Sequence, residues 1–407
     1  MEKGIEYLRK KLQNKQRRVD LRYKYYDMKA AAEDLLRVNA EFRWLAYSLG
    51  WCAKAVDSIA DRIIYDGIDN DDFQIGQIYE LNNSDVLFDS SVLSSLISSC
   101  SFLYIGKNDS GYPTIQVIDG GNATGEIDTT NNMLTEGYAV LKRGNNKEPT
   151  LEAYMLPHKT LYYVNGRLDE SMTFDHPAPY PLLVPVIYRP DAKRPFGHSR
   201  ITRACMDVTQ GVLRTFRRME VSSEYYSYPQ KYVLGLSEDA EFNNRAASMS
   251  DFLDFRKDED NDKPTVGQFQ QQSMAPYVEE LKAFASIFAG ETGLTLDDLG
   301  FNTANPSNFD AIRASHEGLR LTARKAQRTY STAFINAGYL AACIRDNKTY
   351  DRYAFAKTRV AWAPIFEPDA AAMGAIGDAI FKINQAVPDF IGARGVHRLT
   401  GLESDND

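Results

Sequence analysis

The chain is organised around one stretch, Gly293-Leu-Thr-Leu-Asp-Asp-Leu-Gly-Phe-Asn-Thr-Ala-Asn-Pro306, and the long segment that follows it. The glycine, asparagine and aspartate content of the stretch is typical of a loop. Asn305-Pro306 marks the end of that loop, because the residue before a proline avoids the α region and proline suits a first helical turn. We therefore expect a loop that leads directly into a helix starting near Ser307.

The segment after this loop carries one continuous helical pattern. Its apolar residues recur at steps of three, four or seven, and they are Ile312, Leu319, Ala323, Ala326, Tyr330, Phe334, Ala337, Ala341 and Ile344. Because no proline interrupts the pattern before Asp346-Asn347, the predicted helix has roughly 39 residues and a length of about 58 Å.

A basic stripe runs beside this apolar face. Arg313, Arg320, Arg324 and Arg328 recur at steps of seven, four and four, and Lys325 lies just off the stripe. The region from Asn305 to Arg345 holds six basic and two acidic residues, whereas the whole chain has a net charge of -8. Such a stripe is often only a solvated helix face. Its direct connection to the preceding loop favours a functional surface.

Composition places the chain among soluble globular proteins. Its 407 residues allow two or three domains, and its 43% hydrophobic and 25% charged content is ordinary. The negative net charge argues against a protein that coats nucleic acid with its whole surface, but it permits a local basic site. Met1 to Lys11 does not read as a signal peptide, and no stretch approaches 18 uncharged apolar residues. The four scattered cysteines, Cys52, Cys100, Cys205 and Cys343, are typical of reduced thiols in a cytoplasmic protein.

Residues 1–49 are predicted to be helical and strongly charged. Their first part is basic, with Lys10, Lys11, Lys15, Arg17, Arg18 and Arg22 followed by Tyr23, Tyr25 and Tyr26. Interleaved basic and aromatic residues can contact nucleic acid. We favour the alternative that this helix docks on a neighbouring subunit.

The next region predicts an α+β domain over residues 70–190. Helices are expected over 50–67 and 85–100, and then the period changes from 3.6 to two. Short strands separated by turns are expected around 102–105, 114–118, 138–141, 151–155 and 160–164. Residues 176–197 contain six prolines and predict an extended linker.

Two helices then flank an excursion. The first runs from Arg200 to about Tyr226 and is stopped by Pro229, and the second runs from Tyr277 to Thr292. Between them lie two strand-like pieces and the acidic run 251–262. After Asn347 the chain is expected to be extended, and helices over 370–386 and 388–399 precede an acidic tail.

Short motifs that carry chemistry are absent from the sequence. The sequence contains no GxxxxGK[ST], HExxH or GxSxG. His316-Glu317 reads as a surface pair rather than a metal site. The acidic run 251–262 lacks the central glycine and terminal glutamate of an EF-hand, so a solvated or partner-facing surface is favoured over a cation site. We therefore predict no catalytic residue, no metal site and no cofactor.

The order of these parts resembles the portal protein, or head–tail connector, of tailed bacteriophages of the siphovirus type. The resemblance covers roughly residues 40–400, and its order is more specific than any single motif. It is carried by Ala55 to Gly67, by Phe196-Gly197-His-Ser199, by Tyr228-Pro229-Gln230, by Asn305 to Leu319, and by Val360-Ala-Trp362 to Pro368-Asp369.

The resemblance implies a mainly α fold with an α+β wing domain that assembles into a ring. Its parts would be N-terminal helices and wing (1–198), first stem helix (199–228), clip (229–275), second stem helix (276–293), tunnel loop (294–306), long tunnel helix (307–346), wing return strand (347–368), and a small helical crown with a tail (369–407).

The resemblance also implies a function. Twelve copies would form a ring at one capsid vertex of the virion, after assembly in the host cytoplasm. Double-stranded DNA would pass through its channel during packaging and ejection without sequence specificity. The partners would be the terminase large subunit, the major capsid and scaffolding proteins, and a head–tail adaptor. The ring would be no enzyme, and it would contact no membrane.

Site residues follow from the same resemblance. The tunnel loop would contribute Thr295, Leu296, Asp297, Asp298, Leu299, Phe301, Asn302 and Asn305. Of these, Asp297, Asp298, Asn302 and Asn305 would face DNA, whereas Leu296, Leu299 and Phe301 would anchor the loop or line the constriction. The stripe Arg313, Arg320, Arg324 and Arg328 would approach the channel or pair with acids of the next subunit, and we favour pairing. In the clip, the residues that would contact partner proteins are Asp251, Asp254, Asp258, Glu259 and Asp260.

Two other functions stay open on the sequence. One is a capsid assembly or scaffold protein that forms no closed ring. The other is a nucleic-acid-processing enzyme whose site would be assembled from distant carboxylates such as Asp297 and Asp298.

Overall fold

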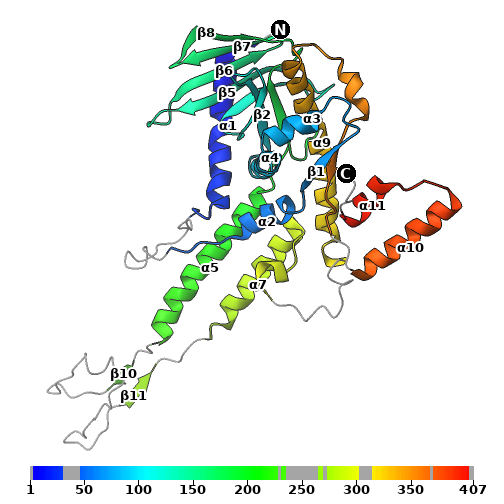
Figure 1. Cartoon of the computed structure of the whole chain (residues 1–407). Helices are drawn as coiled ribbons and strands as arrows, with labels where there is room; N and C mark the ends of the chain where they lie inside the picture. The colour runs from blue at the N-terminus through cyan, green and yellow to red at the C-terminus, as the bar shows by residue number, and fades with distance from the viewer. Residues whose placement is uncertain are drawn as a thin grey trace, which may run out of the picture.

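The long helix expected after the loop is the central element, α9 (Glu317–Arg345). The computed structural model describes residues 3–30, 46–227, 231–234, 265–268, 273–301, 314–366 and 370–402, so the expected start of this helix near Ser307 lies outside them. Every residue from Ala333 to Ile344 is buried, which is the mark of a helix enclosed on all sides. The first half buries only one face. The rest of the molecule is arranged around α9 (Figure 1).

Aromatic packing joins α9 to two preceding helices. Phe334 stacks on Phe88 of α4 (Ser84–Ser98), with ring centroids 3.9 Å apart. The hydroxyl of Tyr79, in α3 (Ile75–Leu81), donates a hydrogen bond to the backbone carbonyl of Phe334. A Cβ on Gly338 would lie 2.8 Å from Ile75 Cδ1, so a glycine is needed where α3 approaches α9. These contacts hold the three helices in one core.

A three-stranded antiparallel sheet packs on α4 and α9. Its order is β3-β2-β9, with β2 (Cys100–Lys107) between β3 (Pro113–Ile118) and β9 (Leu183–Ile187). The prediction of an extended linker over 176–197 was wrong for β9, whose five residues are all buried. Pro185 is tolerated there because β9 lies at the edge and pairs with β2 among the described strands.

A five-stranded antiparallel meander lies beside this sheet. It contains β4 (Ala123–Ile127), β5 (Leu134–Arg143), β6 (Pro149–Leu156), β7 (Lys159–Val164) and β8 (Arg167–Asp175), paired in chain order. The sequence predicted β5, β6 and β7. It missed β4, which begins directly after the turn at residues 120–122, and β8, in which Glu170 interrupts the alternate apolar positions Leu168, Met172 and Phe174.

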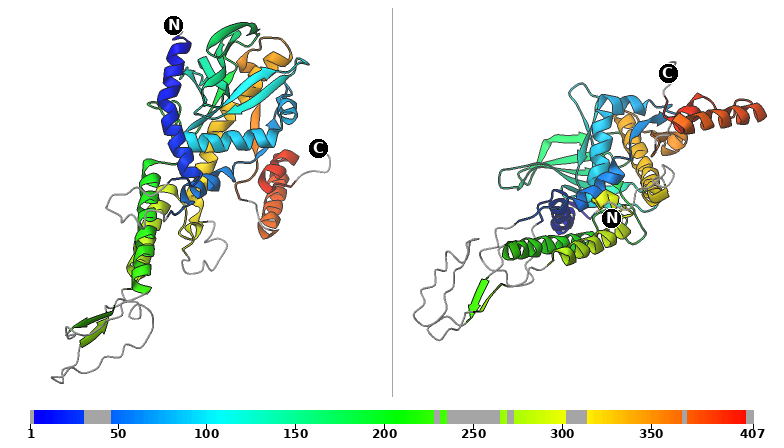
Figure 2. Two further views of the ribbon diagram at one scale, coloured as in Figure 1. Left: turned by 90° about the vertical axis from the view of Figure 1, so that its left-hand side faces the viewer. Right: turned by 90° about the horizontal axis from the view of Figure 1, so that it is seen from below.

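The N-terminal helix α1 (Ile5–Tyr26) packs on this meander within the same chain. Its Leu8 and Leu12 are buried against Tyr138, Val140 and Tyr154 of β5 and β6. One face of this helix is therefore occupied within its own chain, and docking on a neighbouring subunit stays a prediction for its exposed face. Its place beside the sheet is clear in Figures 1 and 2.

Buried carboxylates explain why the helix is basic. Glu152 is only 3% exposed, and its carboxylate accepts hydrogen bonds from Arg9 at 3.0 and 2.7 Å. Lys11 Nζ lies 2.5 Å from Glu126, and Lys3 Nζ lies 3.0 Å from the same carboxylate. Burial opposes the charged form of Glu126, but these lysine hydrogen bonds outweigh it and hold its pKa below the usual value. Arg9 and Lys11 of α1 thus neutralise carboxylates of the sheet on which the helix packs.

The helix predicted over 50–67 ends early. α2 runs from Trp51 to Ala60, and Tyr65–Asp69 forms strand β1 instead. β1 pairs antiparallel with β12 (Arg359–Trp362), almost 300 residues later in the chain. Such a distant partner leaves no local signal, so the sequence pattern predicted a helix that continues to residue 67.

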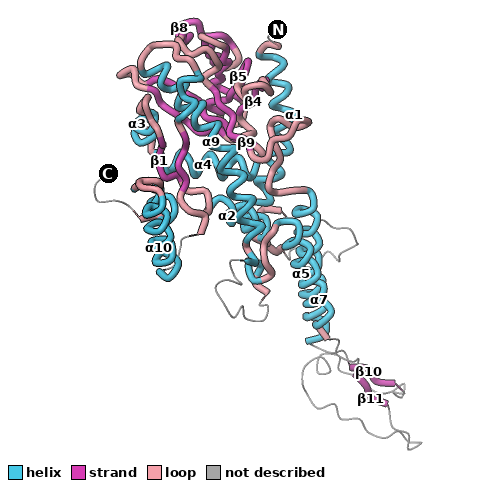
Figure 3. The backbone as a smooth tube through the Cα atoms, turned by 90° about the vertical axis from the view of Figure 1, so that its right-hand side faces the viewer, coloured by secondary structure: helices cyan, strands magenta, loops and turns pink. Residues whose placement is uncertain are grey.

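A two-helix arm projects from the body of the molecule. α5 (Arg203–Ser227) and α7 (Ala275–Thr292) lie side by side, and β10 (Lys231–Leu234) pairs antiparallel with β11 (Thr265–Gln268) at the far end (Figures 1 and 3). The helices meet closely, because a Cβ on Gly211 would lie 2.7 Å from Phe284 Cζ. Ser222 and Tyr277 share a hydrogen bond of 2.7 Å.

The C-terminal region adds a second helical pair, α10 (Ala370–Ala386) and α11 (Ala393–Thr400). It is linked to β12 through residues 363–369, and a short 3-10 helix, η3 (Arg352–Lys357), precedes β12. His397 of α11 lies 3.0 Å from Asp66 of β1, which ties α11 to the strand pair.

One arginine connects the arm to the body. Arg200 is 7% exposed and lies just before α5. Its Nε donates to the carbonyl of Ala55 in α2 at 3.1 Å, and its Nη2 donates to the carbonyl of Thr292 at the end of α7. Its backbone N–H donates to Leu96 of α4 at 2.8 Å. A single side chain therefore satisfies carbonyls of two helices where the arm leaves the body.

Replacing Arg200 by methionine is expected to destabilise the chain. The carbonyls of Ala55 and Thr292 would stay buried without a donor, which costs roughly 3 kcal/mol in the free energy of unfolding. Urea unfolding followed by circular dichroism measures this loss. Arg203→Met, at an exposed position two residues after Ile201, is the control and should change the free energy by less than about 0.5 kcal/mol. Equal effects of the two variants would contradict the assigned role.

Replacing Arg9 by methionine is expected to loosen α1. Glu152 would remain buried and charged without its partner, at a cost of about 3 kcal/mol. Amide hydrogen exchange in α1 reports the loosening. Arg9→Met combined with Glu152→Gln should recover much of the loss, because the uncompensated charge is gone. An additive double variant would refute the pairing.

Candidate functional site

The loop between α7 and α9 begins at a left-handed glycine. Gly293 has φ 69°, and its N–H donates to the carbonyl of Ala289 at 2.7 Å, so α7 ends there. The chain then forms the short 3-10 helix η2 (Asp297–Leu299), which is closed by Gly300 at φ 87°. The loop predicted to start at 294 thus has an ordered first half.

Asp298 organises that first half. Its Oδ2 accepts hydrogen bonds from the backbone N–H and the hydroxyl of Thr295, each at 2.9 Å. His316 Nε2, at the start of α9, lies 3.2 Å from the same oxygen. Burial opposes the charged form of Asp298, but the Thr295 and His316 contacts outweigh it and hold its pKa below the usual value. The carboxylate of Asp298 is thus engaged within the chain, and the expectation that it faces DNA stays a prediction.

The apolar residues of the loop pack into the core. Leu299 is 7% exposed, Leu296 packs against the same core cluster, and Phe301 meets the ring of Trp51 at 6.4 Å in an edge contact. Of the two roles expected for these residues, the structure supports anchoring. Asp297 is exposed. Asn302, Asn305 and Arg313, together with the clip residues Asp251, Asp254, Asp258, Glu259 and Asp260, lie outside the described residues.

A cavity of about 1240 Å³ lies between α9, β1, β12 and α11. Arginine side chains from four segments line it, namely Arg320, Arg324, Arg328, Arg352, Arg359, Arg394 and Arg398, and His397 lines it as well. Asp66 and Asp69 of β1 line it as well. The fold therefore adds cations from η3, β12 and α11 to the stripe expected on α9.

Three of these arginines already have hydrogen-bond partners within the chain. Arg320 forms a bidentate pair with Glu317 at 2.7 and 2.6 Å, and its hydrogen bonds lower the pKa of Glu317. Arg352 donates to the side-chain carbonyl of Asn336 at 2.8 Å, and burial lowers its pKa. Arg359 donates to backbone carbonyls, including that of Thr358 at 2.8 Å. These three arginines support the structure around the cavity.

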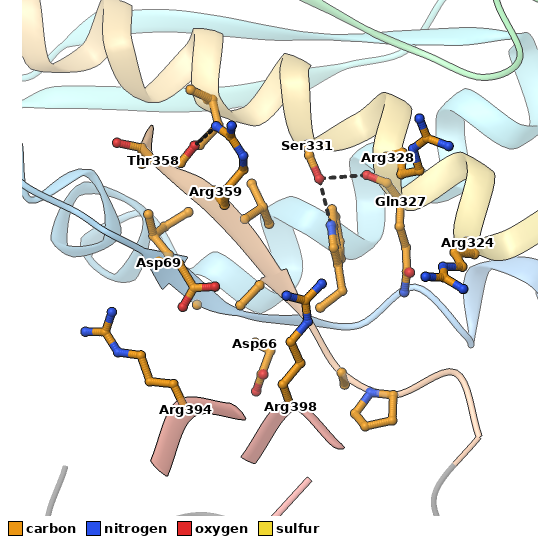
Figure 4. A pocket seen from close by; sticks show the side chains of 18 of the residues that line it. Asp66, Asp69, Arg324, Gln327, Arg328, Ser331, Thr358, Arg359, Arg394 and Arg398 are labelled. Carbon is orange, nitrogen blue, oxygen red and sulfur yellow. Dashed lines mark hydrogen bonds between the residues drawn. The ribbon is translucent and has the colours of Figure 1, made fainter. Parts of the chain in front are cut away.

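The remaining arginines are unpaired within the described part of the chain. Arg324, Arg328, Arg394 and Arg398 are exposed and form no hydrogen bond or ion pair with the described residues. In Figure 4, Arg324 and Arg328 extend from α9 on one side of the cavity, whereas Arg394 and Arg398 rise from α11 on another. The cations do not converge on one point. The arrangement suits an extended anionic surface better than one small anion.

Sequence reasoning found the α9 part of this surface and missed the rest. Arg394 and Arg398 are spaced by four on a helix, which is a signal for one shared face. Nothing local connects them to α9, because their approach depends on the contact of α11 with β1 through His397 and Asp66.

Other chemistry is sparse in the residues that the structure covers. Among them, no group of three or more His, Cys, Asp or Glu side chains could hold a metal ion. All four cysteines are buried and free, as the sequence predicted. No helix in the described ranges is both long and apolar enough to span a bilayer.

No family model matches the sequence, and no curated protein matches it. Among solved structures, the chain is similar to one in the virion of the native gene transfer agent (GTA) particle, with a TM-score of 0.42 and 14% identity, over 87% of this chain and 90% of that chain. It is similar to a chain of the native GTA neck computed with C12 symmetry, with the same values. A chain of the empty GTA neck computed with C6 symmetry has a TM-score of 0.40 at the same identity and coverage.

Asp298→Asn is expected to loosen the start of the loop. Removing the negative charge weakens the contacts to Thr295 and His316 by about 1 kcal/mol, which raises the exchange rate of the Thr295 amide about fivefold. Asp297→Asn, at the exposed neighbouring position, is the matched control.

The same contacts give a pH dependence with a defined sign. Because the folded-state pKa of Asp298 is below the ordinary value of about 4, its stabilisation is complete above that pH and is lost as the pH falls through the folded-state value. Amide exchange of the wild type should therefore approach that of Asp298→Asn in acid. A constant difference between the two proteins across that range would contradict this account.

Proposed function

We propose that the chain is the portal protein of a tailed bacteriophage. In this role, copies of the chain close into a ring at one capsid vertex, and double-stranded DNA passes through the ring during packaging and ejection. The stem is the arm formed by α5 and α7, the clip contains β10 and β11, and the wing contains α1 and the two sheets. The C-terminal pair α10 and α11 forms the crown.

The arm and the loop attached to it support this proposal most directly. Two helices leave the body side by side, carry a strand pair at their far end, and return into an anchored loop followed by the central helix. An arm of two helices has little core of its own. In a ring, arms of successive copies would lie against one another and surround a channel, which supplies the missing contacts.

Exposed apolar side chains support an assembly. On α7, Val278 is 42% exposed and Ile287 is 53% exposed, so the described part of the chain leaves both side chains partly uncovered. In the crown region, Phe381 is 70% and Phe390 is 68% exposed. Exposed large apolar groups on the arm, on α10 and on the segment after α10 favour contact with further protein.

The loop gives the channel its proposed constriction. Leu299 and Phe301 hold its first half on the core, and Asp298 ties that half to the start of α9. In the proposed channel, Asn302 and Asn305 would face DNA with uncharged side chains. Such a surface would neither bind the duplex tightly nor recognise its base sequence, which suits the passage of DNA of any sequence.

The remaining roles follow from a passive conduit. The ring would hydrolyse nothing and would work with a separate ATPase, the terminase large subunit, which would bind at the clip during packaging. A head–tail adaptor would occupy the clip later. The wing and crown would contact the major capsid and scaffolding proteins, and the proposed location is the portal vertex of the virion.

Electron microscopy of the purified full chain tests the ring. We expect closed rings, twelvefold in the virion, with a central hole wide enough for a DNA duplex. Ile287→Asp combined with Val278→Asp should reduce the fraction of closed rings, because charges would enter the contacts between arms. A chain that stays monomeric at all concentrations, or that forms only open filaments, would exclude the portal function.

A further inference from the structure

The outward face of α9 carries a cationic patch with an apolar centre. We define it as Leu321, Arg324, Lys325 and Arg328, which surround a hollow of about 500 Å³. Leu321 is 52% exposed, and the three cations make no hydrogen bond or ion pair with the described residues. At 100° per residue, these positions lie opposite the buried Tyr330 and Phe334. The patch therefore points away from the core.

The outward face of α4 carries the opposite pattern. We define the acidic patch as Asp61, Asp85, Val86 and Asp89, where Asp61 follows the last residue of α2. Val86 is 70% exposed, and the three aspartates have no cationic partner among the described residues. Burial and the nearby charges of Asp85 and Asp61 raise the pKa of Asp89. Mutual repulsion of these carboxylates would be relieved by cations.

The two patches cannot meet within one chain. α4 and α9 already contact each other through their buried faces, where Phe88 stacks on Phe334 and the hydroxyls of Ser95 and Tyr330 lie 2.6 Å apart. The patches lie on the faces turned away from this contact. Any complementary contact between them therefore requires a second copy.

We propose that the acidic patch of one copy docks on the cationic patch of the next. Val86 and Leu321 form the apolar centre of the contact, and the aspartates pair with Arg324, Lys325 and Arg328 around it. Because the contact uses two different patches, it is head-to-tail, and repetition of such a contact closes a ring when the rotation allows. The inference rests on the proposed ring and identifies one of its subunit interfaces.

This contact assigns Arg324 and Arg328 of the basic stripe to assembly rather than to DNA. Arg320 is excluded from it, because Glu317 already occupies its guanidinium. Interfacial charge pairs fix register and partner choice. Arg324, Lys325 and Arg328 would then determine how each copy is oriented around the channel.

Charge reversal tests the contact. Arg324→Glu with Arg328→Glu gives a chain with two acidic patches, and Asp85→Arg with Asp89→Arg gives a chain with two basic patches. We expect association of each variant alone to weaken at least ~30-fold, because like charges would face each other. An equimolar mixture should assemble again with the two variants alternating. Analytical ultracentrifugation and electron microscopy measure both results.

Matched variants control for charge alone. Lys142→Glu with Lys159→Glu, and Asp109→Arg with Glu170→Arg, make the same changes at exposed positions outside the two patches, and both should assemble as the wild type does. Circular dichroism checks that every variant is folded. The proposal is overturned if either patch variant assembles normally, or if the mixture of folded variants does not recover association.

Cross-linking tests the proposed contact independently of whether a ring forms. A Val86→Cys chain mixed with a Leu321→Cys chain should form an intermolecular disulfide, whereas either chain alone should form far less; the four native cysteines are buried. If cross-linking and charge rescue succeed but only filaments or dimers form, the ring fails and the contact stands. If rings form but neither test succeeds, the contact fails and the ring stands.

Discussion

The stack of Phe334 on Phe88 determines most of the arrangement around it. It joins α9 to α4, and with Tyr79 bound to the carbonyl of Phe334 it brings α3 to the same core. Because the second half of α9 is buried on all sides, each neighbouring element must present an apolar face to it. The small residues there, such as Gly338, let those neighbours approach closely. The sheets and the arm are then attached outward from a rigid centre.

The arm depends on this centre through few contacts. Arg200 satisfies carbonyls of α2 and α7 at the base, and the loop after α7 is held by Leu299, Phe301 and Asp298. Because the arm is attached to the body at its base and extends into solvent, protein contacts along its length would stabilise it. In the proposed ring, neighbouring arms would supply these lateral contacts.

Charge has two roles in the molecule, and burial separates them. On α1, Arg9 and Lys11 neutralise Glu152 and Glu126 of the meander, so their value lies in compensating carboxylates that solvent does not reach well. On α9, Arg324 and Arg328 are exposed and unpaired within the described residues, so they are available to another molecule. Both helices read as basic in sequence. The position of the acidic partner, in the same chain or in the next, distinguishes them.

The sequence by itself determined the elements whose signals are local. The periodicity of α9, the proline and glycine boundaries of α5 and α7, and the alternation in β5, β6 and β7 each arise within a short window. The prediction that the apolar loop residues serve as anchors was one of two alternatives, and it followed from hydrophobicity alone. The contact of Asp298 with His316 could not be predicted in this way, because the two residues are 18 positions apart.

Only the tertiary structure decided the rest. β1 forms a strand because β12 pairs with it, and β9 forms a strand because it pairs with the edge of β2. α1 is held on its sheet by the ion pair between Arg9 and the buried Glu152. The cationic cavity likewise requires α11 to meet β1. In each case the free energy comes from a contact between residues far apart in the chain, which no local pattern records.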